Sequence, residues 1–416
     1  MPDLTIPSLR TENPSSVCLV GAGTVGRAIL GEHLKHRIDV VLIDANVDSL
    51  QSACEAAGKQ FREIRIERIK PLVGEMPTAR MSFGAASAPS IVIESIPENL
   101  ALKQSLFLDL RQRCGADVIL ASNTSNLQIA SIFEPLGNDP RCCGMHFFMP
   151  VADRPLVECI PTASTSSLTK SICQTHATRI CKKTLHVRDS PGFVVNRLLA
   201  PYLNQSLLML EHGIDASMLA AASIMFGMPM SPLQLIDTIG LRTAFDSGRI
   251  FWQSFPSRLD PAPILAGMIK ARARFYDAAN TTSDRLNIHA PLSEPAKQVI
   301  AKYHRDVRSW SIEEVAQIIS IPMWIEAAEA MATGLVCDQA SIELAMQCGL
   351  GYDQQNGFFG YFDALGSKVL KHQLETTSLQ FRGLRAPAQL VACLVSGNNP
   401  SEAAARYAWT KVGLAS

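Results

Sequence analysis

The feature that most constrains the fold is a glycine-rich segment near the amino terminus, where an apolar run leads into the pattern Gly-x-Gly-x-x-Gly. Residues 17–20 have the composition of a buried strand, and an apolar helical stretch follows the last glycine directly. Three glycines at this spacing allow a tight turn, close approach of the backbone to a pyrophosphate, and close packing of the helix on the strand. The pattern therefore predicts a dinucleotide-binding βα unit. Its expected cofactor-binding residues are Gly21, Gly23, Thr24, Val25 and Gly26.

The next apolar run predicts which nucleotide this unit binds. Residues 40–43 read as a second buried strand, and Asp44 at its end lies 18 residues after Gly26. A carboxylate there can accept hydrogen bonds from both ribose hydroxyls of the adenosine, whereas it repels a 2'-phosphate. The amino terminus of the helix offers unpaired N–H groups and a partial positive charge to the phosphates. We expect NAD rather than NADP, and a glycine-rich turn without a cofactor is the alternative.

Composition limits the remaining classes of function. The chain has 416 residues, more than a single core usually holds, so two or three domains are expected. Its 38 Lys and Arg residues balance 38 Asp and Glu residues, which gives no net attraction to nucleic acid or to an anionic membrane. The eleven cysteines are scattered without Cys-x-x-Cys pairs, which argues against a zinc site and against a disulfide framework. No signal peptide or membrane-spanning stretch is recognisable, so we expect a cytoplasmic protein without a metal and without membrane insertion.

The first part of the chain alternates between strand and helix patterns. A helix is expected from residue 47 to about residue 70, with basic residues at Arg62, Arg65, Arg68 and Lys70. Further buried strands are expected at residues 91–95, 118–122, 144–148 and 156–160. This alternation predicts an α/β Rossmann-type domain with a doubly wound, mostly parallel sheet and a ligand crevice at the carboxyl ends of its strands.

The rest of the chain is expected to form an all-α domain. Ser190 can cap a helix, Pro191 fits its first turn, and apolar residues at helical spacing continue to Leu210. Two later segments resemble each other, with Gly227 matching Gly349 and Asp237 matching Asp363, which predicts two homologous helical repeats. The expected segments are an N-terminal tail (1–15), an NAD-binding Rossmann domain (16–188), helical repeat 1 (189–280), a linker (281–300), helical repeat 2 (301–385) and a C-terminal segment (386–416).

Four polar residues follow or lie within these strands and the first long helix. Oxidation of a secondary alcohol needs a base, and histidine has the free pKa nearest neutrality. A carboxylate on the other ring nitrogen fixes the tautomer, and Ser or Asn donors can bind the alcohol or the product carbonyl. The candidates for these roles are His146, Glu158, Ser125 and Asn196.

The segments that carry these residues, ASNTS, GMHFFMP, PLVECI and SPGFVVNRLL, closely resemble the 3-hydroxyacyl-CoA dehydrogenase family. The resemblance covers roughly residues 16–370, and the duplicated helical part looks like the dehydrogenase portion of the bacterial multifunctional fatty-acid oxidation subunit. It implies NAD-dependent oxidation of L-3-hydroxyacyl-CoA to 3-ketoacyl-CoA, as in β-oxidation of fatty acids. By the same resemblance His146 is the general base and Glu158 orients it, while Ser125 and Asn196 bind the substrate oxygen. Glu98 and Lys103 of the segment PENLALK are implied to face the cofactor beside Asp44.

Each of these residues also has a structural interpretation. His146 can be a core histidine with satisfied hydrogen bonds, and Glu158 can be a surface strand residue. Asn196 can bond a neighbouring loop, because buried amides need partners. Ser125 can cap a helix beginning near residue 126, and Lys103 can be an ordinary surface lysine.

The chain also departs from the family pattern. Met149 stands where the family usually has Asn, the segment between Asp44 and the strand at residue 91 is shorter than usual, and a glycine-rich loop near residues 270–280 is reduced. Family members bind coenzyme A with a helical hairpin in that shortened segment, so the basic residues there either meet its phosphates or form a solvated face. Two alternatives therefore stay open: a dehydrogenase of a free 3-hydroxy acid, and a catalytically weakened protein that binds NAD or acyl-CoA.

The expected partners follow from the same resemblance. They are an acyl-CoA substrate, no nucleic acid, and a possible separate hydratase or thiolase, because the hydratase domain of the multifunctional subunit is not recognised here. Relatives with one helical repeat pair two chains through their helical domains, whereas two fused repeats can bury that surface within one chain. We therefore expect a stable monomer.

Overall fold

The computed structural model describes residues 16–83, 89–277, 290–305, 309–397 and 399–413, and the chain divides into two units between Ser190 and Pro191. The predicted tail and residues 281–289 of the predicted linker lie outside the described residues, and a helix begins at Glu294 within the rest of that linker.

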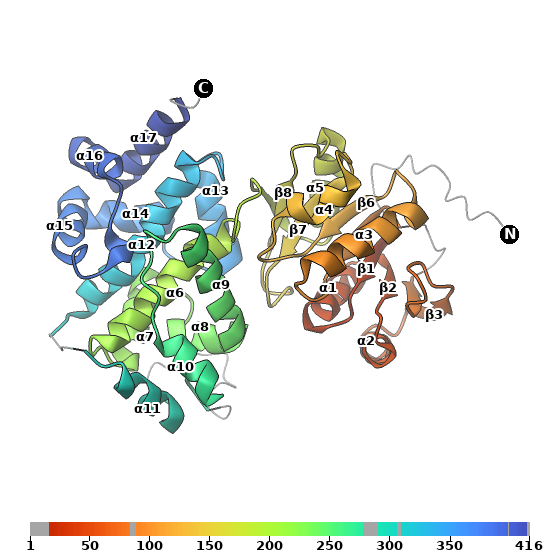
Figure 1. Ribbon diagram of the computed structural model, residues 1–416, viewed down its shortest axis with the longest axis horizontal. Coiled ribbons are helices and arrows are strands. Elements are labelled where there is room, and N and C mark those ends of the chain that lie inside the picture. The colour runs from red at the N-terminus through yellow and green to blue at the C-terminus, as the bar shows by residue number, and fades with distance from the viewer. Residues whose placement is uncertain (1–15, 84–88, 278–289, 306–308, 398, 414–416) are drawn as a thin grey trace. The chain divides into compact units, whose positions relative to one another are not determined.

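A single sheet organises the described part of the first unit, in the order β3-β4-β2-β1-β5-β6-β7-β8-β9 (Figure 1). The strands are β1 (Ser16–Val20), β2 (Asp39–Ile43), β3 (Arg65–Ile69), β4 (Thr78–Ser82), β5 (Ile91–Glu94), β6 (Ile119–Ser122), β7 (Cys142–Phe147), β8 (Leu156–Pro161) and β9 (Lys183–His186). The central strands β2, β1, β5, β6 and β7 are parallel, and β8 returns antiparallel to β7. The chain leaves β1 first toward β2 and later toward β5, so the order reverses at β1, where such sheets bind their ligands.

Helices cover both faces of the sheet. They are α1 (Thr24–Lys35), α2 (Val47–Gln60), α3 (Leu100–Cys114), α4 (Ile129–Phe133) and α5 (Ser167–Arg179), with a 3-10 turn η1 (Glu134–Leu136) after α4. The apolar residues of α1, α2 and α5 form one core with alternate strand residues such as Leu19 and Ile93. Over the other face, Lys103 of α3 contacts Glu94 of β5, and Ile129 of α4 lies against Gly144 of β7. The predicted doubly wound Rossmann-type domain is thus confirmed.

The predicted long helix at residues 47–70 is wrong in its second half. The helix α2 ends at Gln60, and residues 65–69 form the edge strand β3, which pairs with β4. The side chains of β3 alternate between its two faces, as in a strand. Ile66 lies near Gly58 of α2, whereas Arg65 and Glu67 are exposed on the opposite face and contact each other. The pairing partner β4 lies beyond a turn and gives this segment its backbone hydrogen bonds.

The described part of the second unit is helical. Its α-helices are α6 (Val195–Glu211), α7 (Ala216–Phe226), α8 (Pro232–Ile239), α9 (Leu241–Ser254), α10 (Ile264–Ala271), α11 (Glu294–Lys302), α12 (Ile312–Ala332), α13 (Gln339–Leu344), α14 (Gly357–Leu365), α15 (Ser367–Thr377), α16 (Ala388–Ser396) and α17 (Pro400–Gly413). A π-helical turn η3 (Ala345–Leu350) extends α13, and a 3-10 turn η4 (Arg382–Leu384) precedes α16. The long helix α12 is buried on nearly all sides and packs against α6, α7 and α17.

The first long helix of this unit begins later than predicted. Gly192 and Phe193 both have positive φ angles, and α6 starts at Val195, so Ser190 does not cap it. The left-handed backbone at Gly192 and Phe193 forms a turn between the last strand of the sheet and α6, which delays the helix by several residues.

Two sets of helices in this unit show the same local devices. Asp237 of α8 accepts the backbone N–H groups of Phe275 and Tyr276, and Asp363 of α14 accepts the backbone N–H of Ser401. The Asp237–Phe275 and Asp363–Ser401 contacts each join residues 38 positions apart in the sequence. The glycine match is shifted, however. Gly227 ends α7 in a left-handed conformation, whereas Gly351 rather than Gly349 does so after η3. Common descent of the two sets stays a prediction.

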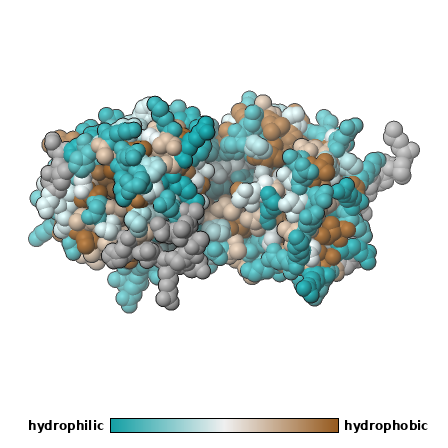
Figure 2. Space-filling model, turned by 90° about the horizontal axis from the view of Figure 1, so that it is seen from below, coloured by the Kyte–Doolittle hydropathy of each residue, from teal (hydrophilic) through white to brown (hydrophobic). Residues whose placement is uncertain are grey.

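No helix of the described residues is long and apolar enough to span a bilayer. On the face seen in Figure 2, hydrophilic residues are interspersed with separate hydrophobic patches.

Candidate active site

The glycine-rich turn between β1 and α1 leaves room for a ligand at one glycine and none at the other two. A Cβ atom at Gly21, where φ is +109°, would lie 2.6 Å from the carbonyl oxygen of Ser95. A Cβ at Gly26 would lie 1.9 Å from the carbonyl oxygen of Gly21. A Cβ at Gly23 would meet no atom within 4 Å, so this position opens onto free space. The first and last glycines close the turn, and the middle one admits a pyrophosphate.

The ends of α1 and β2 fit the other parts of NAD. Gly23 caps α1 without a side-chain bond, so Thr24 and Val25 begin a helix whose terminal N–H groups can bind phosphate. Asp44 lies at the tip of β2, where its Oδ2 accepts the Ala22 N–H at 2.6 Å and its Oδ1 accepts the Asn46 N–H at 2.7 Å. Each carboxylate oxygen keeps a further lone pair for a ribose hydroxyl. The residues present therefore fit NAD.

His146 lies between a carboxylate and a hydroxyl. Its Nδ1 is 2.8 Å from Glu158 Oε2, and its Nε2 is 3.2 Å from Ser125 Oγ. His146 faces Glu158 directly across the β7–β8 pair, and the two side chains are 5% and 0% exposed. An ionised carboxylate only accepts, so Nδ1 carries the proton and Nε2 keeps a lone pair toward Ser125. Because Glu158 is fully buried, the alternative that it is a surface strand residue is wrong.

Strand register explains why these polar groups share one face. Glu94 of β5 lies beside Ser122 of β6, which lies beside Gly144 of β7, two residues before His146. Because side chains alternate along a strand, His146 and Glu158 point to the same side as Glu94. This is the side covered by α3 and α4, opposite the core formed with α1 and α5. The edge of the Phe148 ring packs against His146, with ring centroids 4.6 Å apart.

Ser125 lies in the loop after β6, and Glu98 holds that loop. Glu98 Oε1 accepts the backbone N–H groups of Ser125 and Asn126 at 3.2 and 3.1 Å, together with the hydroxyl of Thr124 at 2.5 Å. The following helix α4 has Gln128 at its N-cap position. The alternative that Ser125 caps this helix is therefore wrong.

Lys103 is a buried residue, which corrects its interpretation as a surface lysine. Its side chain is 1% exposed, and its Nζ lies 2.5 Å from Glu94 Oε1 and 3.3 Å from Glu98 Oε2. Its ammonium group is therefore surrounded by protein carboxylates. A direct contact of Lys103 with the cofactor stays a prediction.

Two further residues of the prediction belong to different units. Asn196 is half-buried at the second residue of α6, in the second unit, and its place in the catalytic set stays a prediction. Met149, in the first unit, follows β7 and is 41% exposed. Its thioether accepts hydrogen bonds weakly and donates none.

Sequence reasoning missed three residues that organise the site. Asn123 Oδ1 accepts the Phe147 N–H at 2.8 Å and ties the Ser125 loop to β7. Asp189 accepts the N–H groups of Ile129 and Ala130 at the start of α4, and burial raises the pKa of Asp189 although these bonds oppose the rise. Glu94 holds Lys103. Only Asn123 carried a signal, since it lies within the ASNTS motif.

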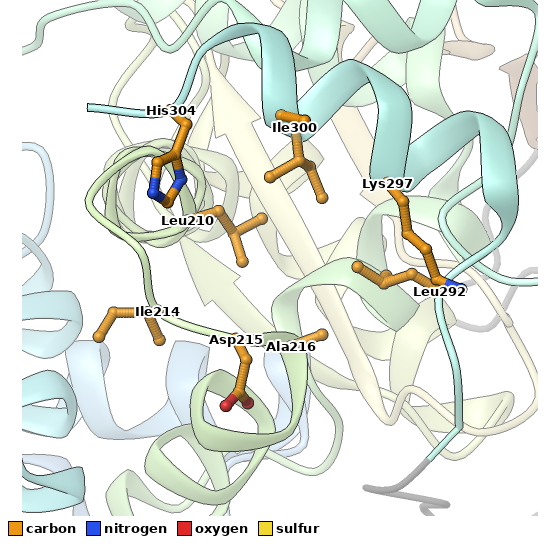
Figure 3. Close-up of a pocket in the computed structure, with 9 residues that line it drawn as sticks. Leu210, Ile214, Asp215, Ala216, Leu292, Lys297, Ile300 and His304 are labelled. Carbon is orange, nitrogen blue, oxygen red and sulfur yellow. The ribbon is translucent and has the colours of Figure 1, made fainter. Parts of the chain in front are cut away.

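No group of three or more His, Cys, Asp or Glu side chains in the described residues can hold a metal ion. A cavity of about 270 Å³ lies in the second unit, where Leu210 of α6 and Ile300 of α11 face it (Figure 3). None of the predicted site residues lines this cavity.

Comparison with known proteins gives two family matches. Residues 16–190 match the model of the 3-hydroxyacyl-CoA dehydrogenase NAD-binding domain, and residues 192–276 match that of the 3-hydroxyacyl-CoA dehydrogenase C-terminal domain. The two matched ranges are adjacent and follow the order of the two units.

Solved structures are similar over most of their length. A 3-hydroxybutyryl-CoA dehydrogenase from Escherichia coli is 19% identical with a TM-score of 0.71, and the match covers 97% of this chain and 100% of that one. The (S)-3-hydroxybutyryl-CoA dehydrogenase PaaH1 from Ralstonia eutropha is 26% identical with a TM-score of 0.51, covering 62% of this chain and 95% of that one. The dehydrogenase part of multifunctional enzyme 1 from Caenorhabditis elegans is 22% identical with a TM-score of 0.57, covering 87% of this chain and 86% of that one.

Proposed function

Because this chain belongs to the 3-hydroxyacyl-CoA dehydrogenase family and is an NAD-dependent oxidoreductase, we propose that it oxidises an L-3-hydroxyacyl-CoA to the 3-ketoacyl-CoA. The observation that carries this proposal is the line of contacts from Ser125 through His146 to Glu158. NAD, when bound, accepts the hydride from C3 of the substrate. The residues of the chain must then remove the hydroxyl proton and hold the oxygen.

His146 is the proposed general base. Its Nε2 lone pair takes the proton of the C3 hydroxyl, so the C–H electron pair leaves as hydride and a carbonyl forms. Glu158 accepts the Nδ1–H throughout and stabilises the imidazolium that results. The low exposure of both side chains strengthens this electrostatic support, because little water screens it.

Ser125 and Asn196 are proposed to bind the substrate oxygen. The Ser125 hydroxyl donates to His146 Nε2 in the absence of substrate and can instead donate to the substrate oxygen once that oxygen takes its place near Nε2. The Asn196 amide is a second donor of suitable chemistry. Donors of this kind stabilise the oxygen as its proton leaves.

The test is NADH formation from 3-hydroxyacyl-CoA substrates of increasing acyl length. Two of the similar structures are named 3-hydroxybutyryl-CoA dehydrogenases, so 3-hydroxybutyryl-CoA is the first substrate of the series. We expect turnover with NAD and little with NADP, because Asp44 repels a 2'-phosphate. His146→Gln should lower kcat by roughly a thousandfold, since general-base catalysis contributes about 10²–10⁴-fold. No turnover at any acyl length despite NAD binding would refute the proposal.

A free 3-hydroxy acid is the second candidate substrate. The observation in its favour is the β3–β4 hairpin, which stands where the family resemblance implies a helical hairpin that binds coenzyme A. The edge strand β3 still carries basic residues such as Arg65 on its exposed side, which suits either a phosphate or solvent. Comparing kcat/KM for 3-hydroxybutyryl-CoA and for free 3-hydroxybutyrate decides between the two. Higher kcat/KM for the thioester supports the first proposal.

A further inference from the structure

Glu94 carries a charge in the interior of the first unit. It is the last residue of β5, its side chain is 0% exposed, and it lies on the face of the sheet that bears His146. A buried carboxylate is unfavourable unless other groups replace its water. The proposed chemistry does not use Glu94, so its charge needs another explanation.

Both oxygens of Glu94 have close donors. Oε1 accepts from Lys103 Nζ at 2.5 Å and from the Ile96 N–H at 2.7 Å, and Oε2 accepts from Ser122 Oγ at 2.7 Å. Lys103 is as deeply buried as its partner. The two residues therefore form an ion pair whose attraction is screened little by water.

Lys103 extends this pair toward the Ser125 loop. Its Nζ lies 3.3 Å from Glu98 Oε2, and the other oxygen of Glu98 accepts the N–H groups of Ser125 and Asn126. Because the Glu98 side chain is 34% exposed, packing alone does not fix it. The ammonium group of Lys103 holds one oxygen of Glu98 and so leaves the other oriented toward the loop.

We propose that Glu94 is a positioning residue, which acts through Lys103 and Glu98 to fix the loop that presents Ser125 to His146. Glu94 neutralises Lys103, so Glu98 keeps its negative charge for the amides of Ser125 and Asn126. Without the charge of Glu94, the ammonium group has a single carboxylate partner and draws Glu98 away from those amides. The kinetic part of this inference rests on the proposed function, whereas the ordering of the loop does not.

The first test measures the loop itself. Amide hydrogen exchange of Ser125 and Asn126 should become at least several-fold faster in Glu94→Gln than in the natural chain, because their acceptor is displaced. Glu32→Gln is the matched control, since Glu32 is also buried and its Oε1 lies 3.1 Å from the buried Nζ of Lys182. The control should leave exchange at Ser125 and Asn126 unchanged. Unchanged exchange in folded Glu94→Gln would overturn the proposal even if the protein showed no dehydrogenase activity.

The second test asks whether Glu94 acts through Ser125. Glu94→Gln should lower kcat by roughly ten- to hundredfold, since misplacement of a reacting group costs about this much. In a Ser125→Ala background the same substitution should change kcat by less than about twofold, because nothing remains to be positioned. An equal loss in both backgrounds would contradict the proposal. Should Glu94→Gln not fold, Glu94→Asp keeps the charge, withdraws it from Lys103, and should give smaller changes of the same kind.

Discussion

At the scale of single residues, the site depends on where polar side chains leave the strands. His146 and Glu158 face each other across β7 and β8, and Ser125 follows β6, so neighbouring strand ends deliver all three to one edge of the sheet. Gly144 contributes by having no side chain: a Cβ there would lie 2.7 Å from Ile129 Cδ1. The glycine therefore allows α4 to pack closely against β7.

Met149→Asn is expected to raise the turnover of 3-hydroxybutyryl-CoA. The family resemblance places Asn at this position, and one hydrogen bond made to the transition state is worth about 2–4 kcal/mol. The exposed side chain of Met149 can be replaced without leaving a core cavity. We expect kcat to rise roughly tenfold or more, as measured by NADH formation. Met149→Leu, which adds no donor, should leave kcat unchanged. No gain in Met149→Asn would instead favour adaptation to another substrate.

At the scale of elements, a buried pair of histidines joins α1 to α5 and predicts how stability depends on pH. His33 Nδ1 lies 2.7 Å from the Ile29 carbonyl, and its Nε2 lies 2.9 Å from His176 Nε2. Burial lowers the pKa of His33 from 6.5 to about 4, and burial also lowers the pKa of His176 well below its usual value. Both imidazoles are therefore neutral in the folded protein, where one ring donates to the other.

We expect this pair to destabilise the fold as pH falls. Below about pH 6.5 both histidines become protonated in the unfolded chain, whereas His33 of the folded chain becomes protonated only near pH 4. Stability is thus lost as pH falls from 6.5 toward 4, by roughly 2–3 kcal/mol for His33 alone. Urea unfolding at several pH values measures the slope. His176→Gln can still donate to His33 but does not titrate, so it should flatten the slope, and the exposed His372→Gln serves as control. An unchanged slope in His176→Gln would show that the loss of stability at low pH comes from other titrating groups.

Some strands and buried residues of the first unit could be predicted from the sequence, and others could not. The central strands were predicted because runs such as residues 40–43 are wholly apolar, as strands covered on both faces must be. The edge strand β3 was not, because its mixture of Arg, Ile and Glu also fits a helix and only pairing with β4 decides the matter. The burial of Lys103 cannot be predicted from the sequence, because its partner Glu94 lies across a turn and no local pattern links the two residues.

At the scale of the whole molecule, the described residues divide into the two units, and a buried charge network organises the second. Arg197 of α6 donates through Nε to Glu326 of α12 at 3.0 Å, and Arg258, between α9 and α10, contacts both Glu326 and Glu329. Tyr407 of α17 donates to Glu329. Buried ion pairs of this kind contribute little net stability, whereas removal of one partner leaves an uncompensated buried charge. The network links α6, α12 and α17 through Arg197, Glu326, Glu329 and Tyr407.

This packing is the basis for expecting a monomer. In relatives with one repeat, the resemblance implies that helical domains of two chains pair, whereas here α12 lies against α6 and α7 of its own chain and is buried along its length. Sedimentation velocity should give a mass of 45.2 kDa at every concentration tested. Trp409 of α17 is 77% exposed and is a surface side chain through which two chains could pair. Trp409→Ala should therefore leave the protein a monomer, as the natural chain is expected to be. A dimer that separates only when the chain unfolds would contradict this expectation. Such a dimer needs a large apolar interface, and here the apolar surface of the helical unit is buried against α12 of the same chain.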